Sequence, residues 1–168
     1  MRRLLGLSLI VAVALIASAA LMREATALNI VTAPISFSAN LTGSDQTVST
    51  TSTWNALAAS DLGGWNVTVS STDFTDGGSE TIAVSNFEIR MLDANIVRTA
   101  GSPILPTSTQ TTFAALSGTP LKIVSADSGE GEGDYDLTPD FQLALAADMY
   151  VGTGTYTATV TVTITSGP

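Results

Sequence analysis

The chain has 168 residues, of which 45% are hydrophobic and 12% charged, and it contains neither cysteine nor histidine. The absence of both residue types excludes a disulfide framework, a Cys/His zinc site and a Cys or Ser–His nucleophile. The net charge of −9 also excludes a surface that attracts the phosphate backbone of nucleic acids.

Residues 1–27 have the pattern of an export signal. Arg2 and Arg3 give the positive start, residues 4–22 form an apolar run, and 25–27 (Ala-Thr-Ala) fit a small-x-small cleavage motif. The alternative is a retained membrane anchor, because a helix of this length reaches about 28 Å. In both cases residues 28–168 are expected outside the cytoplasm, secreted or at the cell surface, and only an uncleaved N-terminal segment would contact a membrane.

The rest of the chain shows repeated alternation of apolar and polar residues, which is typical of strands with one buried face. The alternating runs are 35–41, 65–70, 87–91, 141–145 and 155–165. In the last run threonine occupies every odd position, and serine and threonine together make up about a quarter of the chain.

Glycine and proline turns separate these runs, at 63–64, 76–78, 101–103, 118–120 and 152–154. Single helical turns are expected at 56–62 and 93–97. We therefore predict that residues 28–168 form one all-β domain. It would be an antiparallel β-sandwich of about seven to nine strands, behind an N-terminal signal helix.

Three aromatic residues are candidates for stacking on a ligand. Trp65 is in phase with Val67 and Val69 in its alternating run, so a core position competes with a sugar-stacking role. Trp54 has no such neighbours and is expected to be the exposed aromatic. Tyr156, at the start of the C-terminal run, completes the candidate binding set.

The segment 127–136 is unusually rich in acidic residues and glycine. Its carboxylates belong to Asp127, Glu130, Glu132, Asp134 and Asp136. Oxygen ligands on a flexible loop suit calcium, which takes about six to eight of them, although the EF-hand spacing is missing. The alternative is a solvated loop that keeps strand edges from pairing. The sequence indicates no cofactor apart from this candidate calcium site.

The sequence does not favour an enzyme. A chain with no histidine or cysteine, and with Lys122 as its one lysine, offers few groups for acid–base work at neutral pH. Residues 127–129 (Asp-Ser-Gly) match the tripeptide of aspartic proteases, but such enzymes need a second carboxylate in an apolar pocket. A glycosidase pair among the many acids stays open by counting alone, with ten aromatics in the chain to build a sugar cleft.

The run Gly64-Trp65-Asn66-Val67, followed by Phe74, resembles the first signature of the WxL-type cell-surface domain family, a Gly-Trp-x-Leu strand with an aromatic about ten residues later. The resemblance continues at 81–87. It is closest at 154–164, where the family has Gly-x-Tyr and a second Trp-x-Leu. It covers about residues 30–168.

The chain departs from the family pattern in two places. Val67 stands for the leucine of the first signature, and the second signature reads Val162-Thr163-Ile164, without its tryptophan. The resemblance implies non-covalent binding to the peptidoglycan of Gram-positive cell walls, without enzyme activity, and puts any role of the second tryptophan in doubt. The partners would be cell-wall polysaccharide or other surface proteins.

Long-range electrostatics do not favour wall binding. Loss of Arg2, Arg3, Arg23 and Glu24 on cleavage changes the net charge from −9 to −11, and Gram-positive walls are generally polyanionic. Binding would therefore need local hydrogen bonds and stacking, or divalent cations that bridge residues 127–136 to wall phosphates.

The alternative function is a structural subunit of a surface fibre or pilus that assembles by β-strand addition. The run 155–165 is apolar on one face and uncharged, and residues 28–34 are an apolar stretch that fits an extended tail. Such a tail can add as a strand to the exposed sheet edge of the next subunit. The competing interpretation is that both segments are ordinary strands of one closed sandwich.

Overall fold

The computed structural model describes residues 28–40, 43–57, 63–147 and 155–168, so the predicted signal or anchor at 1–27 and the turn at 152–154 lie outside the described residues. The described residues contain fourteen strands, all paired antiparallel, and two 3₁₀ turns. The predicted all-β, sandwich-like fold is therefore confirmed. None of the helical turns in these ranges is long and apolar enough to cross a bilayer.

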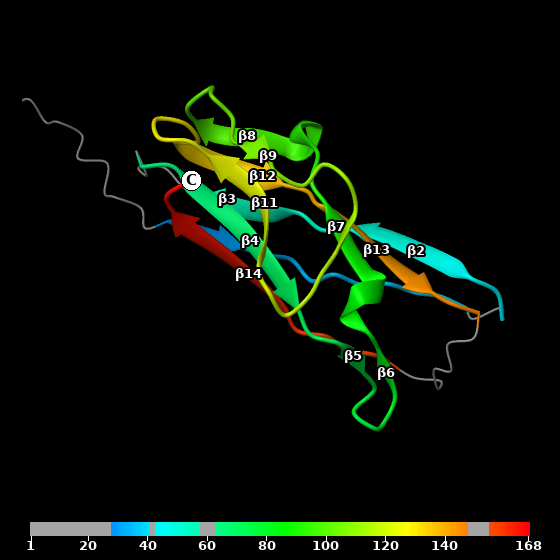
Figure 1. Cartoon of the computed structure of the whole chain (residues 1–168). Helices are drawn as coiled ribbons and strands as arrows, with labels where there is room; N and C mark the ends of the chain where they lie inside the picture. Colours follow the sequence, from blue (N-terminus) through cyan, green and yellow to red (C-terminus); the bar gives the residue numbers. More distant parts are fainter. Residues whose placement is uncertain (1–27, 41–42, 58–62, 148–154) are drawn as a thin grey trace, which may run out of the picture.

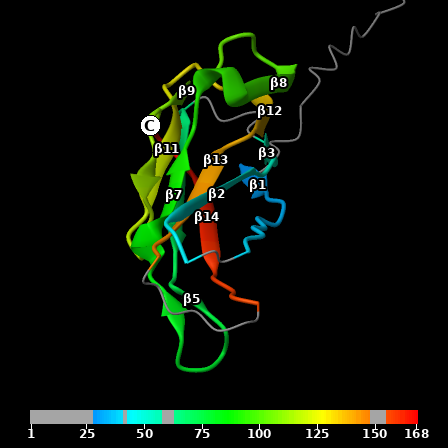
Figure 2. The same ribbon diagram turned by 90° about the vertical axis from the view of Figure 1, so that its right-hand side faces the viewer.

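Three four-stranded sheets and one two-stranded ribbon make up the fold (Figures 1 and 2). Sheet A contains, in spatial order, β1 (Asn29–Val31), β3 (Trp54–Leu57), β12 (Gly133–Leu137) and β8 (Ile96–Gly101). Sheet B contains β10 (Ala114–Ala115), β7 (Phe87–Arg90), β13 (Asp140–Leu145) and β2 (Gln46–Thr51). Sheet C contains β14 (Val160–Ser166), β4 (Trp65–Ser71), β11 (Leu121–Ala126) and β9 (Thr107–Ser108). The ribbon pairs β5 (Phe74–Thr75) with β6 (Thr81–Ile82).

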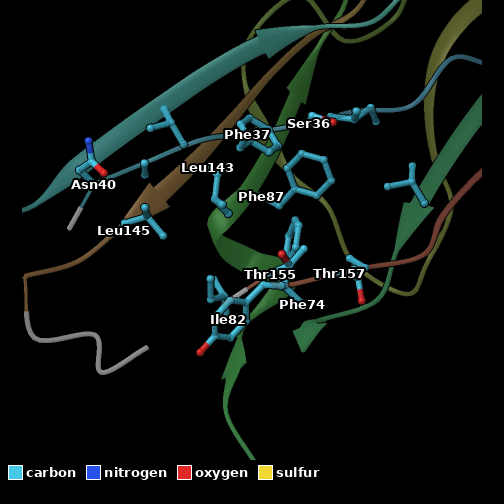
Figure 3. Close-up of a pocket in the computed structure, with 16 residues that line it drawn as sticks. Ser36, Phe37, Asn40, Phe74, Ile82, Phe87, Leu143, Leu145, Thr155 and Thr157 are labelled. Carbon is cyan, nitrogen blue, oxygen red and sulfur yellow. The ribbon is translucent and has the colours of Figure 1, made fainter. Parts of the chain in front are cut away.

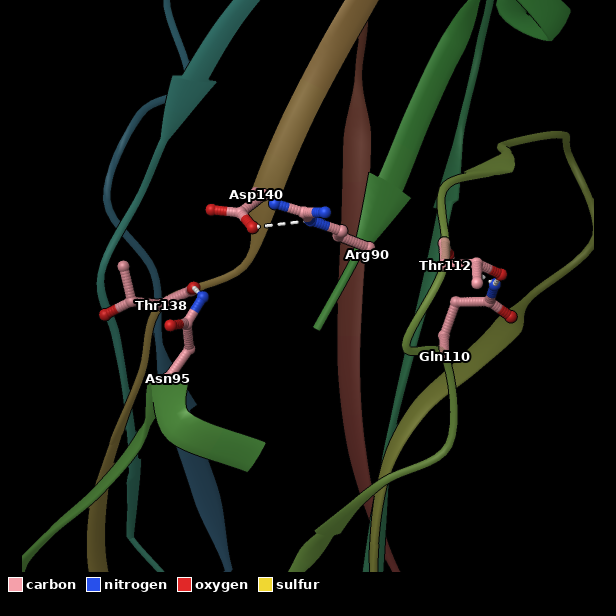
Figure 4. Close-up of polar contacts among 6 residues, drawn as sticks. All are labelled: Arg90, Asn95, Gln110, Thr112, Thr138 and Asp140. Carbon is pink, nitrogen blue, oxygen red and sulfur yellow. Dashed lines mark hydrogen bonds and ion pairs between the residues drawn. The ribbon is translucent and has the colours of Figure 1, made fainter. Parts of the chain in front are cut away.

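Sheets A and B are two ends of one long sheet, because three neighbouring strands pass from one to the other. β2 leads into β3, β12 into β13, and the turn η2 (Asp93–Asn95) joins β7 to β8, with the same neighbours in both sheets. The ladder is interrupted at Thr138 and Pro139, since proline has no N–H to donate. Asn95 spans the gap: its Nδ2 donates to Thr138 O at 2.9 Å, and Thr138 N donates to Asn95 O at 3.0 Å (Figure 4). These interruptions explain why more strands are present than the seven to nine predicted.

Sheet C packs on the inner face of this long sheet. In β4 every second residue points inward and is buried, beginning with Trp65, Val67 and Val69, as the alternation predicted. The ring of Trp65 packs against Tyr135 of β12, with 6.0 Å between ring centroids, and this contact joins the two layers. The predicted strands at 87–91 and 141–145 are likewise present as β7 and β13.

Three predicted elements differ from the structure. Residues 35–38 keep the in-and-out alternation, with Ile35 and Phe37 half-buried, but the stretch 35–40 joins no ladder because the chain leaves β3 after Val31. Of the helical turn predicted at 56–62, Ala56 and Leu57 belong to β3, with Ala56 fully buried in phase with the strand, and residues 58–62 lie outside the described part of the chain. The C-terminal run is divided: β14 begins at residue 160, and residue 157 forms an isolated bridge to β5.

Candidate functional site

A hollow of about 720 Å³ lies where sheet B meets the β5–β6 ribbon and the chain that leads into β14 (Figure 3). We call it the apolar groove. Its wall comes from segments far apart in the sequence: the N-terminal stretch, the inner face of sheet B, the ribbon and the start of the C-terminal run. The groove is defined by Ile35, Phe37, Phe74, Phe87, Leu143 and Tyr156.

Phenylalanine rings form the floor of the apolar groove. Phe87, on β7, is 1% exposed and meets Phe37 and Phe74 edge to face, with centroid distances of 5.7 and 5.3 Å. Phe141 stacks behind Phe87 at 5.5 Å. Contacts of this kind hold the rings in fixed positions, so the floor is formed in advance of any ligand.

The rim of the groove is polar but uncharged. Tyr156 is half-buried and its hydroxyl donates to Glu80 Oε2 at 3.2 Å, while Ser36, Asn40 and Thr155 supply neutral polar groups. None of the sixteen lining residues in the described part of the chain carries a charge. The arrangement suits an apolar segment or a neutral, hydrogen-bonding ligand.

Trp65 is a core residue. It is 0% exposed, and its indole Nε1 donates to Gly131 O at 2.8 Å, so the buried N–H is satisfied. The ring therefore fastens the segment 127–136 to the edge of the core and does not face solvent, where it could stack on a sugar.

The prediction that Trp54 is exposed is wrong. Trp54 is 0% exposed on β3, and its ring packs against Phe141 with 5.8 Å between centroids. Its Nε1 donates to Ser52 Oγ at 3.1 Å, and Ser52 Oγ donates to Ala33 O at 2.9 Å. This relay gives the buried indole N–H a partner, which makes the burial of the ring favourable. Of the three aromatics predicted to bind a ligand, Tyr156 lines the apolar groove, whereas Trp54 and Trp65 do not.

The five acidic residues of 127–136 are spread over a turn and a strand. Asp127 is exposed in the turn after β11, whereas Asp134 and Asp136 lie on β12 and point away from the core. The Asp136 carboxylate accepts a hydrogen bond from Asn55 Nδ2 on the neighbouring strand. Within 28–40, 43–57, 63–147 and 155–168, no group of three or more acidic residues is arranged to hold a metal ion.

Tyr135 is the residue of this region whose titration is perturbed. Its ring is buried between the layers and its hydroxyl donates to Ile104 O at 3.2 Å. Burial raises the pKa of the Tyr135 hydroxyl above its usual 10.0. Arg98 opposes the rise, and the negative charges of Glu132 and Asp134 add to it.

Sequence reasoning missed a second, shallower hollow on sheet B. Arg90 Nε donates to Asp140 Oδ2 at 2.7 Å, and the guanidinium lies 4.6 Å from the ring centroid of Phe113 (Figure 4 shows the ion pair). Arg90 and Asp140 are cross-strand partners on β7 and β13. Arg90 is one of three basic residues after the predicted cleavage point, and that rarity was the signal that could have singled it out.

Comparison with known proteins gives little similarity. No family model matches the chain, and no curated protein matches it. Among solved structures, a chain of a family 123 glycoside hydrolase from Clostridium perfringens, studied for glycolipid glycan hydrolysis, aligns with a TM-score of 0.38 and 16% sequence identity. The alignment covers 70% of this chain and 18% of that chain, so this chain spans less than a fifth of the enzyme's length.

Proposed function

We propose that this chain is a non-catalytic protein of the extracellular cell surface, exported by residues 1–27, and that it is a structural subunit that joins its neighbours by β-strand addition. The observation that supports this proposal best is the edge of sheet C. β14 is an edge strand of seven residues, and among the described strands β4 alone is hydrogen-bonded to it, although β1 lies close by. A strand edge of this length without a hydrogen-bonded neighbour is a template for a strand from another chain.

The register identifies which backbone groups point outward. Thr72 N donates to Thr159 O at 3.1 Å and Gly167 N donates to Gly64 O at 2.8 Å, at the two ends of the β14–β4 ladder. Because hydrogen-bonded pairs alternate along an antiparallel ladder, the odd residues of β14 bond to β4. The N–H and C=O groups of Val160, Val162 and Ile164 therefore face the free edge, available to an added strand.

Composition supports the same proposal. Natural sheet edges are commonly guarded by charged residues or proline, which prevent accidental pairing. Residues 155–168 include no charged residue, and the one proline in this segment is Pro168, its last residue. Because the β14 edge is uncharged in an otherwise acidic protein, a second copy that docks there meets no local electrostatic repulsion.

Val162→Pro tests the proposal. The Val162 N–H faces the free edge, so proline removes a donor for the incoming strand and leaves the β4 ladder complete. We expect the purified variant to stay folded by circular dichroism and to lose self-association in sedimentation velocity. Thr163→Pro is the matched control: it removes an N–H bonded to β4 and should lower the midpoint of urea unfolding, because a ladder hydrogen bond is lost. Val162→Pro that assembles like wild type would refute a role for this edge.

Wall binding of the WxL kind is a second candidate, favoured by the neutral rim of the apolar groove. The two tryptophans are buried, so a neutral glycan would have to bind through Tyr156 and the polar rim. In co-sedimentation with purified cell-wall sacculi, Tyr156→Ala should reduce binding and the fully buried Tyr135→Phe should not. Binding should persist in EDTA, and release by EDTA would instead support cation bridges from residues 127–136.

A further inference from the structure

The N-terminal segment, residues 29–37, is attached to the rest of the molecule by few backbone hydrogen bonds. β1 pairs with β3 over three residues, and beyond Val31 the segment joins no ladder. Farther along, Ser52 Oγ donates to Ala33 O at 2.9 Å, and Ile35 and Phe37 insert into the apolar groove (Figure 3 labels Phe37 beside Phe87). Apolar side chains in a groove therefore supply most of its attachment.

The dock for this segment is built by the remainder of the chain. The edge of β3, the buried Ser52 hydroxyl and the floor residues Phe74, Phe87 and Leu143 all come from residues beyond 45. Without the segment, the edge of β3 would be unpaired and the groove would lose Ile35 and Phe37 from its wall. The dock is thus complementary to this sequence, whichever copy of the chain supplies it.

Gly43 lies in the connection between the segment and β2 (Gln46–Thr51). Gly43 adopts a φ of +74°, and nothing lies within 4 Å of the position a side chain would take there. Residues 28–44 contain no charge, in a chain whose net charge is −9. Like residues 155–168, this part of the molecule carries no charge that would repel a second copy.

We infer that residues 29–37 are an exchangeable strand, which leaves its own β3 edge and groove and occupies the same dock on a second copy. Exchange recreates the contacts of the segment in trans, so its main costs are the rearrangement of the connection to β2 and the association of two copies. When each copy donates to the next, the chain of exchanges is open-ended and gives a fibre. The inference rests on the proposed function, in that subunits join through strands, and it adds a second junction: the segment pairs with β3 of the next copy and not with β14.

The absence of cysteine allows a direct test by engineered disulfides. Val31 and Asn55 are cross-strand partners whose side chains are both exposed, and opposite residues in an antiparallel pair lie at disulfide distance. Under assembly conditions, an oxidised mixture of Val31→Cys and Asn55→Cys chains should give covalent heterodimers on a non-reducing gel. The double variant, oxidised as a monomer, should be locked in cis and should fail to assemble until reductant is added.

The control pair is Thr47→Cys with Ala144→Cys, which are partners in the β2–β13 ladder outside the exchanged segment. Its oxidised monomer should assemble like wild type. Assembly that continues when the 31–55 pair is locked, with no heterodimers in the mixture, overturns the exchange and leaves the proposed subunit function standing. A wild-type chain that stays monomeric under all assembly conditions overturns both.

Discussion

Two glycines in the acidic segment 127–136 are required by close packing and not by flexibility of the loop. Gly131 has a φ of +66°, and a Cβ there would lie 2.5 Å from Ala126 Cβ and 2.7 Å from Trp65 Nε1. At Gly133 a Cβ would lie 2.2 Å from Ala100 O. Both glycines let backbone approach closely, one for the indole of Trp65 and one for the neighbouring strand β8. The glycine spacing that suggested a loop wrapped round a cation thus has a structural cause.

The relay beneath Trp54 gives a prediction at this scale. Ser52→Ala leaves the buried indole N–H and Ala33 O without their partner, and should lower the free energy of unfolding by about 1–3 kcal/mol. In a Trp54→Phe background no buried N–H remains, so the same change should cost less. Urea unfolding followed by circular dichroism measures the wild type, both single variants and the double variant of this cycle. Equal costs in both backgrounds would contradict the relay.

Tyr135 predicts a dependence of stability on alkaline pH. Its pKa is raised in the folded state chiefly by burial, so the folded chain holds this proton more tightly than the unfolded chain does. The associated stability is complete below pH 10 and is lost as the pH rises through the folded-state pKa. Tyr135→Phe should therefore destabilise the protein more at pH 8 than at pH 11 in urea unfolding. A difference that stays constant between these pH values would show that the hydroxyl does not titrate with unfolding.

At the scale of elements, alternation predicted the strands whose inward residues are large and apolar. β4 could be predicted in this way from Trp65, Val67 and Val69. It failed for β3, because the residues in phase with Trp54 are Ser52 and Ala56, which are small and carry no clear apolar signal. The apolar groove was out of reach for a different reason: it combines segments separated by more than a hundred residues, and single-strand patterns say nothing about which strands become neighbours.

The junction between sheets A and B was also unpredictable, and it gives a prediction of its own. Asn95→Ala removes the amide that donates to Thr138 O across the interruption. Loss of this bond should lower the free energy of unfolding by about 0.5–1.5 kcal/mol in urea titrations. Asn29→Ala is the control, an exposed amide on the edge strand β1, and should change stability by less than about 0.5 kcal/mol. Similar values for both variants would mean that the junction does not depend on Asn95.

Across the whole molecule, the acidic residues lie on other elements than the two uncharged edge strands β1 and β14. The uncharged N-terminal and C-terminal segments meet on one flank, where β1 lies against β14. The acidic residues belong to the other elements, at β12, at the β5–β6 ribbon and at the turns. Two copies that meet through this flank keep their carboxylates apart, but their net negative charges still repel one another at a distance.

That repulsion leads to a prediction for the intact protein. Raising NaCl from about 10 mM to about 150 mM shortens the screening length from about 30 Å to about 8 Å, so self-association should become stronger as salt is added. The carboxylates of residues 127–136 are not gathered into a metal site in the described part of the chain, so CaCl2 and MgCl2 at matched ionic strength should act alike. Sedimentation velocity across the three salts measures this. Assembly that responds to calcium and not to magnesium would instead assign these carboxylates a specific role between subunits, because only a defined set of oxygen ligands discriminates the two ions.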